Sequence, residues 1–552
     1  MKIVTKQISS LEKIRSEKDI PTVQLTAAQV LKNEGFSYQI VILSDTCTRA
    51  KIEPKSEISE FMTIYSVKNA MMDFPIYEDS DDDYITKLPG EMPDILVPIE
   101  EQNGLITVSP KPESIWIKID IPENLPCGSY EINISLKSYN SQFCHDEFYA
   151  VHTLSLEVID AVLPKSDMIF TQWLHADCIA TAHNVKIYSE EHWELIDKYI
   201  KTAHELGINT ILTPVFTPPL DTAIGKKRPS VQLVKITKSG NEFSFDFSLL
   251  KKWIELCRKN SIEYFEISHL FSQWGLEHSP NIIVSENGRD SYMFDERTSA
   301  RDTAYADFLK SFLPALVSFL RKEGIEEKCF FHISDEPNEK QLENYRYAHE
   351  LVLGIYPECK IIDAISDIDF YKTGLIQTPV AATTAIEPFL YNGVENLWAY
   401  YCCAQHKGVS NRFIAMPSYR NRILGFQLYK YGIKGFLQWG YNFYFSQLSL
   451  YEINPYVTTS AERAFPSGDA FSVYPGKDGP LLSLRALVFK EALQDIRLCR
   501  LLERLIGKDK VISAIDAAAE MNITFTDYPR NNIFIPEVNN RLKNMLKDAM
   551  SK

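Results

Sequence analysis

Two patterns of apolar and polar positions divide the chain near residue 163. Before that point, apolar residues alternate with polar ones over residues 114–122, 130–136 and 153–159. Alternation with a period of two is typical of strands that are buried on one face. Short polar turns separate these runs, and no strong helical period interrupts them. The pattern predicts an N-terminal all-β domain over residues 1–163, folded as an antiparallel sandwich.

After residue 163, short apolar runs alternate with long amphipathic segments. Such strand–helix units are typical of a parallel sheet with helices packed on it. About eight units over residues 164–552 predict an α/β domain, a (β/α)8 TIM-like barrel with enlarged loops and C-terminal helices. The expected strands are 169–173, 209–213, 264–267, 329–333, 360–364, 397–401 and 435–439, and the expected long helices are 190–206, 249–258, 303–323, 339–356, 421–431 and 484–505.

Two short segments of the first third have their own predictions. Residues 161–165 are expected to form the linker into the barrel. The acidic run 78–83 is expected to form a solvated loop. A calcium loop is the alternative, although the run lacks the spaced ligands and the glycine of a calcium-binding motif.

Composition and charge narrow the class of protein. Of the 552 residues, 45% are apolar and 24% charged, which is ordinary for a globular protein with a sizeable core. The net charge of −15 repels phosphate backbones and anionic membranes, so we expect no nucleic-acid or membrane partner. No stretch approaches the roughly eighteen apolar residues of a membrane span, and the first residues lack the apolar core of a secretory signal. The ten scattered cysteines show no disulfide or metal spacing, so we expect reduced thiols and a cytoplasmic protein.

The expected strand at 329–333 leads into an unusual pair of acids. Asp335 and Glu336 follow it, and Pro337 comes next. Barrel enzymes carry their reactive groups at the C-terminal ends of the strands, where strict alternation of side chains relaxes and both acids could turn into the barrel mouth. Acidic residues also favour the first turn of a helix. The pattern therefore leaves catalysis and helix capping open.

Other strand ends add aromatic and hydrogen-bonding side chains to the same rim. A sugar ring offers apolar faces for stacking and hydroxyls for polar partners, so such a rim suits a carbohydrate, although each residue alone is more typical of core packing than of ligand binding. His175 and Asp177 do not form the paired histidines of a barrel metal hydrolase, so no catalytic metal is expected. The residues at these strand ends include Trp173, His175, His269, Trp274, Trp439 and Asn442.

Several segments of the predicted barrel stand out in order along the chain: 228–233, the surroundings of His269, 332–337, 398–403, 435–444 and 468–476. Together they resemble the motifs of glycoside hydrolase family 123 and of the broader family once labelled domain of unknown function 4091. The resemblance covers residues 164–505 and, more weakly, the preceding sandwich. It implies a β-N-acetylgalactosaminidase or a close hexosaminidase, exo-acting and retaining.

The resemblance also implies roles for individual residues. The 2-acetamido oxygen of the substrate attacks the anomeric carbon and forms an oxazolinium ion, so the enzyme supplies no nucleophile. Asp335 would orient the acetamido N–H and stabilise the positive charge, and Glu336 would be the general acid and then the general base. Other residues are candidate substrate contacts: Trp439 as the stacking wall, Trp173 on the rim, Asn442, His175, His269 and Tyr401 for hydroxyl or acetamido groups, and Arg228 as a rim contact.

Two other functions stay open from the residues. A glycosidase of this fold could act on a sugar without an acetamido group and recruit a carboxylate such as Glu266 or Asp363. A carbohydrate-binding protein could keep the rim without turnover. In every case the expected partner is a carbohydrate, an oligosaccharide or glycoside, and no cofactor is expected. The sandwich carries no strong motif, so support of the barrel is the default role, with homodimer formation and glycan binding as alternatives.

Overall fold

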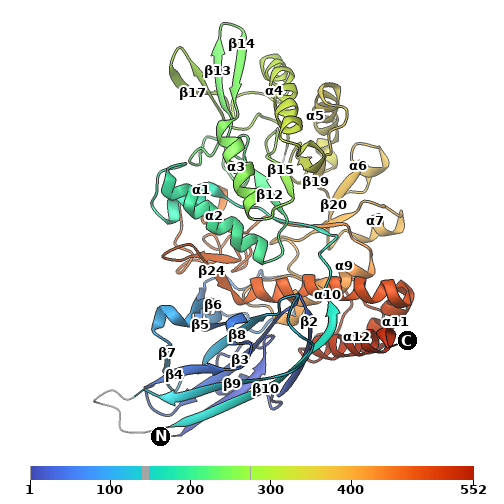
Figure 1. Ribbon diagram of the computed structural model, residues 1–552. Helices are drawn as coiled ribbons and strands as arrows, with labels where there is room; N and C mark the ends of the chain where they lie inside the picture. Colours follow the sequence, from blue (N-terminus) through green and yellow to red (C-terminus); the bar gives the residue numbers. More distant parts are fainter. Residues whose placement is uncertain (1, 140–147, 274, 552) are drawn as a thin grey trace.

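The computed structural model describes residues 2–139, 148–273 and 275–551. Trp274, one of the expected strand-end residues, lies outside these ranges. The N-terminal β structure lies at one end of the molecule and the parallel strands at the other (Figure 1). Helix α10 (Leu484–Ile506) lies across the junction and contacts β3, β6 and β24 on the N-terminal side. Among the helices of the described ranges, none is long and apolar enough to cross a membrane.

The N-terminal region consists of two sheets that enclose a common apolar core. Leucine, isoleucine and valine side chains from both sheets, such as Ile40, Ile117, Ile132 and Leu154, are fully buried there. All described strand pairs are antiparallel except β10 with β2, which is parallel. The first sheet has the order β1 (Ile3–Ser9), β3 (Gly35–Ser44), β8 (Glu113–Asp120), β5 (Met62–Met72), β6 (Gly90–Pro98), β24 (Pro480–Ser483), β23 (Val473–Pro475), and the second β2 (Ala27–Lys32), β10 (Tyr149–Val162), β9 (Gly128–Ser138), β4 (Thr48–Lys55), β7 (Leu105–Val108).

The expected domain boundary at residue 163 does not separate the two parts of the structure cleanly. Strand β10 continues through Val162, so the first residues of the expected linker are strand. Strands β23 and β24, from the far end of the chain, extend the first sheet, with Leu482 opposite Leu96 of β6. A buried ion pair reinforces this contact, because Arg485 of α10 donates two 2.9 Å hydrogen bonds to Asp94 of β6.

Eight parallel strands form the second part, and a single bridge between Phe331 and Ile361 joins its two outermost strands, so the barrel is nearly closed. Every neighbouring pair within it is parallel, as the strand–helix repeat predicts. Their spatial order is β18 (Cys329–Phe331), β15 (Tyr264–Ile267), β12 (Thr210–Thr213), β11 (Ile169–Gln172), β22 (Gly435–Gln438), β21 (Trp398–Tyr400), β20 (Thr378–Ala382), β19 (Ile362–Ala364).

The connections between these strands depart from a regular (β/α)8 barrel. Helices α6 and α7 have only four and five residues, so the outer helical layer is thin beside β20. Two strand–turn–strand insertions form a separate four-stranded sheet, which the sequence pattern does not predict: β13 (Lys235–Ser239), β14 (Glu242–Asp246), β16 (Ile282–Glu286) and β17 (Arg289–Phe294). The helices are α1 (Ala176–Ala182), α2 (Glu190–Glu205), α3 (Ser248–Lys259), α4 (Thr303–Lys322), α5 (Leu342–Ile355), α6 (Asp369–Lys372), α7 (Glu387–Tyr391), α8 (Ser418–Arg422) and α9 (Leu424–Lys430), followed after α10 by α11 (Lys508–Ala519) and α12 (Phe534–Met550).

The acidic run at 78–83 is a loop, but it is not fully solvated. Arg420, which is completely buried, donates two hydrogen bonds of 2.8 and 2.7 Å to the carboxylate of Asp81. Asp83 accepts a hydrogen bond from Tyr419. The expectation of a solvated loop is therefore wrong for these two acids, which pair with α8 because a buried guanidinium needs a carboxylate partner.

Candidate active site

One pocket lies at the C-terminal ends of the parallel strands. Four of the residues that the sequence singles out meet in its wall, namely Trp173, Asp335, Glu336 and Trp439. They come from segments that are far apart in the chain and that follow β11, β18 and β22. The complete lining is Trp173, Leu220, Asp221, Gln273, Asp335, Glu336, Ala364, Tyr400, Cys402, Cys403, Leu437, Trp439 and Phe465.

Asp335 is the more deeply buried of the two adjacent acids, with 7% of its surface exposed. Gln273 donates from Nε2 to Asp335 Oδ2 at 2.6 Å, and its Oε1 accepts the backbone N–H of Asp221 at 2.7 Å. Burial and the charge of Glu336 raise the pKa of Asp335 well above the usual range of an aspartic acid. The acidic pair therefore holds a proton at a pH where an exposed aspartic acid has lost it.

Glu336 reaches the same pocket through an unusual backbone conformation. Its φ is +48°, in the left-handed region that a non-glycine residue rarely adopts, and the following Pro337 restricts it further. This turn explains how adjacent residues, which would point to opposite sides in a strand, share one pocket. The hydroxyl of Tyr400 donates to Glu336 Oε1 at 2.8 Å. The helix-capping alternative is wrong, since Asn338 caps the turn that precedes α5.

Two indole rings form walls of the pocket, and each is held by a buried carboxylate. Trp173 donates from Nε1 to Glu266 Oε1 at 3.1 Å. Trp439 donates from Nε1 to Asp469 Oδ2 at 2.9 Å. Burial raises the pKa of Asp469 to about 7, while the indole N–H opposes that shift. Because both N–H groups are taken, the rings offer the pocket only apolar surface, as stacking on a sugar requires.

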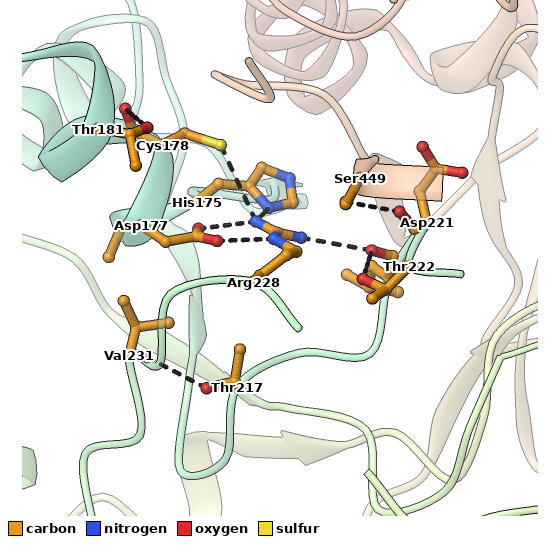
Figure 2. A network of polar contacts seen from close by, with 12 residues as sticks. His175, Asp177, Cys178, Thr181, Thr217, Asp221, Thr222, Arg228, Val231 and Ser449 are labelled. Atoms are coloured by element: carbon orange, nitrogen blue, oxygen red, sulfur yellow. Dashed lines mark hydrogen bonds and ion pairs between the residues drawn. The ribbon is translucent and has the colours of Figure 1, made fainter. Parts of the chain in front are cut away.

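Arg228, His175 and Asn442 lie behind the pocket wall instead of lining it. Arg228 is 4% exposed and donates to both oxygens of Asp177, at 2.6 and 2.7 Å (Figure 2). Burial and the guanidinium lower the pKa of His175 to about 3, so this ring is neutral, and its Nε2 lies 3.1 Å from the carbonyl oxygen of Trp439. The side-chain amide of Asn442 accepts a hydrogen bond from the backbone N–H of His175 and donates one to its carbonyl oxygen. The expected rim contact of Arg228 is thus corrected to an internal ion pair.

Tyr401 and His269 are also away from the pocket surface. Tyr401 is completely buried and packs against Phe436 of β22 and Phe489 of α10, on the outer side of the barrel. Its neighbour Tyr400 points inward, as alternation along β21 requires. His269 is 1% exposed, and its ring stacks on that of another histidine beneath the acidic pair.

Sequence reasoning missed several lining residues. Tyr400 stands in a segment that carries the family resemblance, so alternation beside Tyr401 was an available signal. Asp221 and Gln273 come from long irregular loops after β12 and β15, and no local pattern marks them. Asp221 adds a third carboxylate to the pocket, and burial raises its pKa to about 6. Within the described ranges, no group of three or more His, Cys, Asp or Glu side chains is placed to hold a metal ion.

One solved structure has the same architecture over the whole chain. A family 123 glycoside hydrolase from Clostridium perfringens, studied for the details of glycolipid glycan hydrolysis, superposes with a TM-score of 0.77 at 16% identity. The match covers 100% of this chain and 99% of that one. Two further matches have TM-scores of 0.17 and 0.14: AvmM, which catalyses macrocyclization in alchivemycin A biosynthesis, at 9% identity over 30% of this chain and 91% of its own, and a PapD-like domain of human CEP192, at 12% identity over 25% and 84%.

The sequence itself gives the family. No curated protein matches the chain. The model of the glycoside hydrolase 123 catalytic domain matches residues 173–502, a region that contains the whole pocket. This region is more than half of the chain, and its fold is shared with a solved family member. The protein therefore belongs to glycoside hydrolase family 123.

Proposed function

We propose that the protein is an exo-acting, retaining β-N-acetylgalactosaminidase, or a close hexosaminidase, that uses substrate-assisted catalysis. The observation that carries this proposal is the meeting of Asp335 and Glu336 in one aromatic-walled pocket. Adjacent acids with different surroundings suit a reaction in which one carboxylate stays ionised beside a developing cation while the other holds a proton.

Glu336 acts as the general acid and then as the general base. It first donates its proton to the leaving oxygen as the acetamido oxygen of the substrate bonds to the anomeric carbon. It then takes a proton from the water that opens the oxazolinium ion, so the configuration is retained and no enzyme–sugar bond forms. The hydrogen bond from Tyr400 fixes the orientation of Glu336 for both steps.

Asp335 accepts the acetamido N–H and stabilises the positive charge. In the free enzyme burial favours its protonated form, so binding of an N–H donor favours transfer of the shared proton to Glu336. Trp173 and Trp439 supply stacking surfaces for the sugar ring. The nine described cysteines have free thiols, which supports a cytoplasmic enzyme that meets oligosaccharides or small glycosides.

A panel of three aryl glycosides tests the substrate class. We expect cleavage of the β-N-acetylgalactosaminide, the β-N-acetylglucosaminide or both, with no comparable cleavage of the β-galactoside. The reason is that the sugar without an acetamido group lacks the nucleophile. A thiazoline mimic of the intermediate should inhibit strongly. Cleavage of the galactoside at a similar rate would exclude the oxazolinium mechanism.

A glycosidase for a sugar without an acetamido group is the second candidate, and Asp221 is the observation that favours it. Glu266 and Asp363, the carboxylates expected for this role, are completely buried and bonded to other side chains, whereas Asp221 lines the pocket. For the acetamido mechanism we expect Asp221→Asn to raise KM by less than about tenfold, with kcat nearly unchanged, because it removes one binding contact. A loss of kcat of about 10³-fold or more, with a trapped glycosyl intermediate in Glu336→Gln, would assign Asp221 as a nucleophile instead.

A further inference from the structure

Directly beneath the acidic pair, His332 is held between two carboxylates. Its Nε2 lies 2.9 Å from Glu266 Oε1 and its Nδ1 lies 3.1 Å from Asp363 Oδ1. All three side chains are buried, with 1% or less of their surface exposed. A neutral imidazole donates from one nitrogen only, and an ionised carboxylate only accepts. Both hydrogen bonds can form together when the ring is an imidazolium.

The other hydrogen bonds of the two carboxylates suit ionised groups, which only accept. Glu266 also accepts from the Thr171 hydroxyl and from the Trp173 indole N–H, so each of its oxygens faces a donor. Asp363 also accepts the Tyr345 hydroxyl at 2.6 Å and the backbone N–H of Ile333. Burial raises the pKa of Asp363, and these donors together with His332 oppose that shift. Because the ionised forms can accept all of these hydrogen bonds, the proton of this cluster is assigned to the histidine.

The surroundings of the ring support this protonation state. Burial alone would lower the pKa of His332, but the hydrogen bonds and charges of Asp363 and Glu266 outweigh it and raise the pKa to about 10. The ring of His269 stacks on it at 4.4 Å between centroids. Burial and the charge of His332 lower the pKa of His269 well below its ordinary value, so only one of the two rings is charged.

The same residue connects the cluster to the reacting end of the strand. The carbonyl oxygen of His332 accepts the backbone N–H of Leu270, and that of Ile333 accepts the N–H of Phe271. The Ser334 hydroxyl donates to the carbonyl oxygen of Ser272. This ladder aligns residues 332–334 with the loop that presents Gln273 to Asp335. Among the influences on the pKa of Asp335, burial and Glu336 raise it most, and the positive charge of His332 opposes them.

We propose that His332 is a positioning residue that stays positively charged at neutral pH, fixing the end of β18 between Glu266 and Asp363 and keeping Asp335 ionisable beside Glu336. With the imidazolium present, the cluster of His332, Glu266 and Asp363 has a net charge of −1; a neutral side chain at position 332 would leave −2 beneath two further acids. The consequence for Asp335 rests on the proposed function, whereas the charge on His332 does not.

The charge is tested directly by NMR of the wild-type protein with 15N-labelled histidine. At pH 8.5 a histidine of ordinary pKa near 6.5 is neutral, so most of the eleven histidines should show neutral rings. We expect one ring with both nitrogens protonated. The signal of this ring should disappear in His332→Gln. If His332→Gln does not fold, a change in the chemical shift of the same signal in Tyr345→Phe identifies it as His332. Absence of an imidazolium at pH 8.5 would overturn the proposal whatever the activity.

The consequence for the acids is tested by the pH dependence of kcat/KM. Loss of the positive charge in His332→Gln should move both limbs of the profile to higher pH, by about one unit, because it makes proton release from the pair harder. Tyr345→Phe is the matched control, since it removes a hydrogen bond to Asp363 without changing any charge. The electrostatic role would be overturned if the limbs of the pH profile moved equally in both variants. It would also be overturned if they did not move in a folded His332→Gln enzyme.

Discussion

Glu336→Gln is expected to lower kcat/KM for an aryl β-N-acetylgalactosaminide with a poor leaving group by about 10²–10⁴-fold. Glutamine keeps the size of the side chain and can still bond Tyr400, but it cannot donate a proton to the leaving oxygen or accept one from water. A leaving group of low pKa needs little protonation, so the loss should shrink along a series of increasingly acidic phenols. The measurement is kcat/KM for wild type and variant over that series.

Glu339→Gln is the matched control for this loss. Glu339 is an exposed glutamate three residues further along the chain, and it lies outside the pocket. The same charge is removed, so a general electrostatic effect would appear in both variants. We expect the control to keep wild-type kcat/KM. A Glu336→Gln enzyme that loses the same factor on every leaving group would exclude a general-acid role for Glu336.

Much of the fold follows from periodicity alone. The strand at 264–267 and the helix expected at 303–323 were predicted to within a residue, because a short apolar run and a long amphipathic segment leave little ambiguity. Strand β20 was missed, since its five residues include a proline and two alanines, which are poor strand formers. The contribution of β23 and β24 to the N-terminal sheet could not be predicted, because pairing between residues hundreds of positions apart leaves no local pattern.

The pocket residues that lie close to strand ends were predictable from the sequence. Trp439 directly follows β22 and Asp335 lies four residues after β18, and strand ends of a parallel barrel meet at one face. Arg228 and His175 do not line the pocket for a physical reason. Polar residues in strand-end segments and in long loops also satisfy buried backbone groups and charges, and sequence does not distinguish this use from ligand binding. Asp221 was missed because its position depends on the path of a loop, held by Leu448 and Ser449 from a distant segment.

Asp335→Asn is expected to lower kcat for 2-acetamido substrates by about 10²–10³-fold, the cost of removing one preorganised group that stabilises charge in a transition state. The asparagine fits the same space, but it is neutral and cannot stabilise the oxazolinium ion as a carboxylate does. Its effect should differ in kind from that of Glu336→Gln. Charge on the sugar develops whatever the leaving group, so the loss should be nearly constant over the phenol series and should not shrink with acidic phenols.

Gln273→Glu provides the matched comparison, because it places a negative charge where the Asp335 carboxylate now has an amide donor. If Asp335 works as an anion, a second anion 2.6 Å away should raise its pKa and move the acid limb of the kcat profile to higher pH, whereas Asp335→Asn should abolish that limb. Both variants should still bind a thiazoline inhibitor, with reduced affinity. An Asp335→Asn enzyme that keeps wild-type kcat on the acetamido substrates, with its fold intact, would exclude Asp335 from the reaction and leave Glu336 to act with Asp221.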